Sequence, residues 1–112
     1  MDQIIALRRS IHQHAELAFQ EYETQKKIKE VLLSFGIDES KIKACAGTGL
    51  VVDIEGNGDP VENECINTIA LRADIDALPI PEDNPHLEYK TQTKCSHMCG
   101  HDGHTATLTA AA

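Results

Sequence analysis

The chain has 112 residues, which allows at most one domain with a modest hydrophobic core. Its formal net charge of -8 argues against nucleic acid and against anionic membranes as partners, because both attract clustered Lys and Arg. Hydrophobic residues make up 41% and aromatic residues 4%, so a core must rely on Leu, Ile, Val and Ala.

The sequence carries no targeting or membrane-spanning signal. No apolar run approaches the roughly 20 residues that cross a bilayer. The N-terminus, residues 1–5, lacks the basic start and long apolar core of a signal peptide. We therefore expect a protein of the cytoplasm, or of an organelle lumen, with reduced thiols. Cys45 and Cys65 stand alone beside strand-like segments, and we expect both to be small buried residues.

Two amphipathic helices are predicted in the first third of the chain. Apolar residues recur at helical spacing over residues 1–18, and again over residues 21–35, where Gly36 follows as a C-terminal signal. His12 and His14 are two residues apart, so they point to different sides of a helix and cannot hold one ion from it. We predict a surface or partly packed position for both.

The middle of the chain predicts strands. Residues 50–55 are rich in β-branched side chains, a turn cluster follows at 56–60, and residues 68–74 form a second strand-like run. The polar, glycine-containing connection suggests that these two strands form an antiparallel pair. The prolines at 79 and 81 end the second strand, and residues 82–96 read as a polar loop.

Residues 95–104 are the densest group of metal-binding side chains in the chain. A Cys99 thiolate and a neutral His101 imidazole are good ligands for zinc and similar ions, and Gly100 between them allows a sharp bend. A helix is predicted from near Asp102, whose carboxylate suits a helix N-terminus and is able to orient a ligand histidine. A rival interpretation is a closed structural zinc site, for which the four ligands are Cys95, Cys99, His101 and His104.

A second group of carboxylates stands at the end of the predicted strand 68–74. Asp74 and Asp76 lie where ligands and catalytic groups collect in α/β proteins, although capping a turn is a fair alternative role for Asp74. The predicted fold class is α/β: two helices, an antiparallel strand pair, a metal-binding turn and a final helix. We expect that final helix to be cut by the chain end.

These motifs resemble a known family. Residues 71–79 and 97–106 are similar to the two N-terminal signatures of the metallo-amidohydrolases, which include N-acyl-amino-acid amidohydrolases, hippurate hydrolases and indoleacetyl-amino-acid hydrolases. That family is part of the zinc aminoacylase and carboxypeptidase superfamily. Residues 8–24 and 47–51 fit the same pattern, so the resemblance covers nearly the whole chain. The departures are Ala15 in place of proline, Met98 in place of alanine, and the additional Cys95.

The resemblance implies a specific chemistry. It implies that Cys99 and His101 are ligands in a site for two divalent metal ions, zinc or manganese, within a three-layer α/β/α catalytic domain. Asp76 matches the catalytic aspartate that supports a ligand and the attacking water. The substrate would be a small N-acyl amino acid or amino-acid conjugate, and the complete protein a homodimer. The family's general-base glutamate, its other metal ligands and its dimerisation domain match no residue of this chain.

Three hypotheses follow from the sequence. The first is that residues 1–112 are the N-terminal part of such a catalytic domain, inactive and weakly metal-binding on their own. The second is the small structural zinc module that uses Cys95. The third is a non-functional remnant of a hydrolase gene, which a cooperative thermal melt would contradict.

Overall fold

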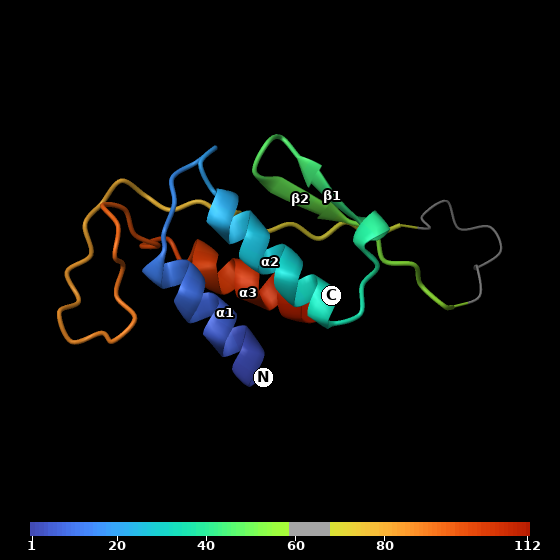
Figure 1. The fold of residues 1–112 in the computed structure, drawn as a ribbon, viewed down its shortest axis with the longest axis horizontal. Helices are drawn as coiled ribbons and strands as arrows, with labels where there is room; N and C mark the ends of the chain where they lie inside the picture. Colours follow the sequence, from blue (N-terminus) through green and yellow to red (C-terminus); the bar gives the residue numbers. More distant parts are fainter. Residues whose placement is uncertain (59–67) are drawn as a thin grey trace.

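A computed structural model describes residues 1–58 and 68–112 of the chain. Three helices pack side by side, and a short β-hairpin lies against them near the middle of the molecule (Figure 1). Within the described ranges, no helix is long and apolar enough to cross a membrane. The elements in chain order are α1 (Asp2–Gln13), α2 (Tyr22–Ser34), the 3-10 turn η1 (Glu39–Lys41), β1 (Ile42–Cys45), β2 (Gly49–Val52) and α3 (His101–Ala111).

Helix α1 is shorter than the sequence predicts. The apolar residues Leu7 and Ile11 are buried as expected, but the helix ends at Gln13 and not near residue 18. The chain then turns to meet residues far along the sequence: the amide of Ala77 donates to the carbonyl of Glu16, at 2.8 Å. Phe19 adopts a φ of 64°, a left-handed conformation that an α-helix excludes. Tertiary pairing therefore overrides the helical pattern after Gln13.

Helix α2 matches its prediction closely. The Glu16 carboxylate accepts hydrogen bonds from the backbone amides of Glu23 and Thr24, at 3.1 and 2.7 Å, and so binds free donors of the first turn. Gly36 follows the helix with a φ of 88°, the left-handed conformation that ends many helices. The stripe toward the core consists of Ile28 and Leu32.

The antiparallel strand pair exists, but its members differ from those predicted. β2 pairs with β1, in a register that sets Ile42 opposite Val52 and Cys45 opposite Gly49. Residues 68–74 form no strand, and Ile69 is 83% exposed. Closing the three-residue turn between β1 and β2 costs less chain entropy than closing a connection of more than ten residues. The prediction of a pair between 50–55 and 68–74 is therefore wrong, whereas the α/β class with one antiparallel pair is confirmed.

The core is small and has two parts. The larger cluster joins α1, α2 and β1, and the smaller one contains Ala15, Ala77 and Cys95. Cys45 is exposed, so the prediction that it is buried is wrong, because its side of β1 is not covered. The end of the predicted turn at 56–60, and Cys65, lie outside the described residues. The members of the larger cluster are Leu7, Ile11, Ile28, Leu32 and Ile42.

Candidate metal centre

The turn before α3 presents the two predicted ligands. Gly100 takes a φ of 85° and a ψ of 17°, a left-handed conformation that favours glycine, and α3 begins at the next residue. Cys99, just before the glycine, has an exposed thiol. The His101 side chain, just after it, keeps 22% of its surface exposed. Both side chains are thus accessible on either side of a bend that only glycine forms without strain.

His101 is held by Asp76. Its Nδ1 lies 3.0 Å from the Asp76 carboxylate oxygen Oδ1 and 3.0 Å from the Asp76 carbonyl oxygen. Both partners accept hydrogen bonds, so Nδ1 is the donor, and the described hydrogen bonds of His101 leave Nε2 free. Metal-binding histidines commonly use this arrangement, in which one ring nitrogen donates to a carboxylate or carbonyl and the other is available as a ligand.

The four residues of the rival closed site do not assemble. Cys95 is buried, and its thiol donates to the carbonyl of Ala15, at 2.9 Å. The rings of His101 and His104 lie 6.1 Å apart between centroids, and His104 is exposed. Within residues 1–58 and 68–112, no three Cys, His, Asp or Glu side chains are arranged to hold one ion. The described part of the chain therefore offers at most two ligands to a given metal ion.

A group of ionisable side chains lies on the buried side of the turn at residues 99–101. Asp102 is fully buried, and its Oδ2 accepts from His12 Nδ1 at 2.7 Å and from Arg8 Nε at 2.9 Å. The prediction that His12 lies at the surface or is partly packed is wrong, because the ring is only 4% exposed. His14 is exposed, as predicted. The spacing of Arg8 and His12 is the signal that sequence reasoning missed, since residues i and i+4 share a helix face.

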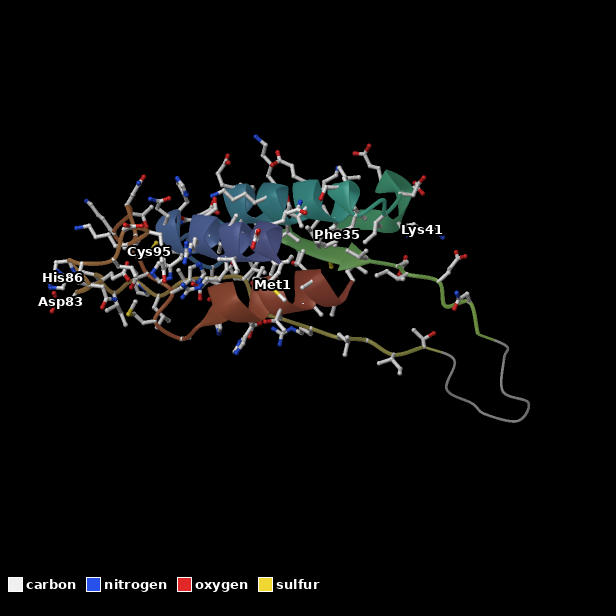
Figure 2. The ribbon with its side chains drawn as sticks, turned by 90° about the horizontal axis from the view of Figure 1, so that it is seen from below. Met1, Phe35, Lys41, Asp83, His86 and Cys95 are labelled. Carbon is white, nitrogen blue, oxygen red and sulfur yellow. The ribbon has the colours of Figure 1, made fainter. Side chains whose placement is uncertain are left out.

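Glu82, in the loop at residues 82–96, also belongs to this group. Its Oε1 lies 2.9 Å from His12 Nε2 and accepts from Asn84, while Oε2 accepts from the amide of Thr91 at 2.6 Å. Burial alone would raise the pKa of Glu82, but these hydrogen bonds, that of Thr91 first, outweigh it and lower the pKa to about 2. The loop itself projects beyond α1, with Asp83 and His86 at its far end (Figure 2).

His97 is a further buried histidine beside the turn. Only 5% of it is exposed, and both ring nitrogens lack a hydrogen-bond partner among the described residues. Burial lowers the pKa of His97, although the Asp102 carboxylate opposes this. The ring lies 6.4 Å from that of His12, between centroids, so His12, which is distant in the sequence, joins His97 on the inner side of the turn.

Comparison with known proteins shows what this site is similar to. Residues 70–112, which include Asp76, Cys99 and His101, match the sequence profile described as Peptidase family M20/M25/M40. Over these residues, which are less than half of the chain, the sequence is similar to this peptidase family. The resemblance of the signatures 71–79 and 97–106 to metallo-amidohydrolases is thereby confirmed at the level of the family.

Individual proteins are similar to most of the chain. A crystal structure of the Bacillus subtilis YXEP protein, described as a dinuclear metal-binding peptidase from the M20 family, has 41% identity and a TM-score of 0.79, over 96% of this chain and 28% of that one. An uncharacterised hydrolase of Staphylococcus aureus is 47% identical over 90% of this chain and 24% of its own length. Thermostable carboxypeptidase 1 of Saccharolobus solfataricus is 40% identical over 96% of this chain and 25% of its own. The chain thus spans about a quarter of the curated relatives that it matches.

Proposed function

We propose that residues 1–112 are the N-terminal part of the catalytic domain of a metal-dependent amidohydrolase or peptidase. In this proposal Cys99 and His101 are metal ligands, and Asp76 is the catalytic aspartate that orients His101 and supports the attacking water. The observation that carries the proposal is the hydrogen bond of His101 Nδ1 to Asp76, because it directs Nε2 of the same ring toward a ligand position.

The donor set fits divalent metal ions. A thiolate and an imidazole suit zinc and its neighbours, and the carboxylate of Asp76 is 32% exposed and so accessible to solvent. When bound, such ions supply Lewis acidity toward a water and toward an amide carbonyl. Asp76 keeps the His101 ring in one tautomer and is able to accept a proton from a water nearby. We propose two ions per complete site, zinc or manganese, in keeping with the dinuclear description of the B. subtilis relative.

The substrate class is proposed from the family signatures. We propose small N-acyl amino acids or amino-acid conjugates, whose amide bond is cleaved, and a homodimeric complete protein. A relative named as a carboxypeptidase supports an amide bond next to an amino acid as the target. A cytoplasmic location stays a prediction from the sequence.

Cobalt binding tests the ligand assignment. We expect Co²⁺ added to the purified chain to produce a thiolate-to-cobalt charge-transfer absorption that the Cys99→Ser variant lacks. The Cys45→Ser variant is the matched control, because Cys45 is also an exposed thiol but lies in β1. Cys95→Ser is expected to keep the absorption, since its thiol contacts Ala15. An absorption that depends on Cys95 would instead support the structural zinc module.

The chain alone is expected to lack activity. The described residues offer at most two ligands to one ion, and a hydrolytic site needs more to hold its metal. We therefore expect no release of the free amino acid from an N-acetyl amino acid in the presence of Zn²⁺ or Mn²⁺. Turnover that is lost on chelation would contradict this expectation. It would not test the ligand assignment, which the cobalt measurement decides.

A further inference from the structure

We propose that His12 and Asp102 are positioning residues of the metal centre, which fix the turn at Cys99–His101 from its buried side. The inference rests on the proposed function, because it concerns the same two ligands. Neither residue is assigned a role by the family signatures. Their place in the structure gives them one: they connect α1 to the first turn of α3, where His101 lies.

Asp102 fixes the backbone next to the ligand. Its Oδ1 accepts from the amide of Gly103 at 2.9 Å, while Oδ2 accepts from Arg8 and His12. Both oxygens are therefore engaged, and the residue is fully buried. Because Asp102 follows His101 directly, holding its side chain against α1 also sets the position of the His101 backbone.

His12 connects this anchor to a second one. One ring nitrogen faces Asp102 and the other faces Glu82, whose second oxygen accepts from the amide of Thr91. The rings of Tyr89 and His12 pack in a T-shaped arrangement, at 5.7 Å between centroids. His12 therefore has one favoured orientation, and it is carried by a helix and not by a loop.

The turn is thus held from two sides. Asp76 contacts the His101 ring directly, and the pair of His12 and Asp102 acts through the backbone. Outer-sphere partners of this kind typically change metal affinity by about 10–100-fold when they are removed. If His12 had only a structural role, its substitution would lower stability, and the effect on metal affinity would not depend on which of the two ring nitrogens is replaced.

Two substitutions separate the two nitrogens. The amide nitrogen of Asn lies near the position of Nδ1, so His12→Asn keeps a donor to Asp102. The amide nitrogen of Gln reaches the position of Nε2, so His12→Gln keeps the contact to Glu82 and loses that to Asp102. We expect the apparent affinity for Co²⁺, read from the charge-transfer absorption, to fall about 10–100-fold in His12→Gln and to stay near the wild-type value in His12→Asn.

A core variant controls for loss of stability. Leu32→Ala removes a buried side chain from α2, away from the turn, and is expected to lower the melting temperature with no change in Co²⁺ affinity. If His12→Gln does not fold, Arg8→Gln serves in its place, because Arg8 is partly exposed and donates to the same Asp102 oxygen. Its Co²⁺ affinity is expected to fall in the same direction.

The outcomes distinguish the two proposals. If the wild-type chain shows no absorption that depends on Cys99, the proposed ligand set itself is wrong. If the wild type shows it and His12→Gln, or Arg8→Gln in its place, binds Co²⁺ as tightly as the wild type, the ligand set stands and the positioning role is overturned. Equal losses in His12→Asn and His12→Gln would also overturn it, since the contact to Asp102 would then not be the one that matters.

Discussion

The Asp102→Ala variant should lose about 3–5 kcal/mol of its free energy of unfolding. The substitution removes the only described acceptor of His12 Nδ1 and of Arg8 Nε, and the His12 ring is almost completely buried. The variant leaves His12 Nδ1 buried without an acceptor, and breaking a buried pair from one side costs more than the pair contributes. The measurement is urea unfolding at pH 7, followed by far-ultraviolet circular dichroism.

The matched control is Asp74→Ala, the same substitution at an exposed ion pair. Asp74 pairs with Arg72, whose side chain is 83% exposed, and such pairs typically contribute about 0–1 kcal/mol. Since a small domain has roughly 5–15 kcal/mol in total, the loss in Asp102→Ala is large enough to be seen directly as a fall in the unfolding midpoint. Similar midpoints for the two variants would show that the buried group around Asp102 contributes little.

The helices could be predicted from the sequence where local signals act alone. Residues 22–34 have a periodic apolar stripe and a terminal glycine, and α2 follows both. The first helix ends early because Glu16 pairs with Ala77, a contact 61 residues apart for which no local pattern exists. The predicted pairing of residues 50–55 with 68–74 is wrong for a related reason. Residues 68–74 have a strand's composition but no neighbour to pair with in the described structure.

The site could be predicted where chemistry is concentrated along the chain. Cys99, Gly100 and His101 stand together, and the bend at Gly100 is found as expected. Asp76 could be placed near them only through the resemblance, because it stands 23 positions before Cys99. The partners Arg8, His12 and Glu82 come from segments distant from the turn and have ionisable side chains, so a pattern that assigns such residues to the surface misses them.

The site also shows why a histidine close to the turn need not be a metal ligand. Of the histidines near the turn, His101 alone combines an Nδ1 fixed by Asp76 with a partly exposed ring. Both ring nitrogens of His12 are hydrogen-bonded to carboxylates, and His97 is buried. Accessibility and a free nitrogen together, and not histidine density, are the features on which the proposal of His101 as a ligand rests.

Acid should weaken the folded state through Glu82. The pKa of this carboxyl lies at about 2 in the folded state, below its ordinary value of 4.5, so the unfolded state binds more protons between these values. The stabilisation is therefore fully present above about pH 4.5 and is lost as the pH falls toward 2. The shift corresponds to roughly 3 kcal/mol. We expect Glu82→Gln to be less stable than the wild type by about this amount at pH 7, and the difference to disappear near pH 2.

Glu88→Gln is the control that assigns the effect to this carboxyl. Glu88 lies in the same loop, is exposed and makes none of the described hydrogen bonds, so its substitution should leave stability close to that of the wild type at every pH. Urea midpoints of the three proteins between pH 7 and pH 2 give the comparison. The decisive feature is convergence: because a protonated Glu82 is neutral and, like Gln, has one acceptor oxygen and one donor group, the wild type and Glu82→Gln become equivalent only in acid. A difference that persists unchanged at pH 2 would show that Glu82 stabilises by packing and not by charge.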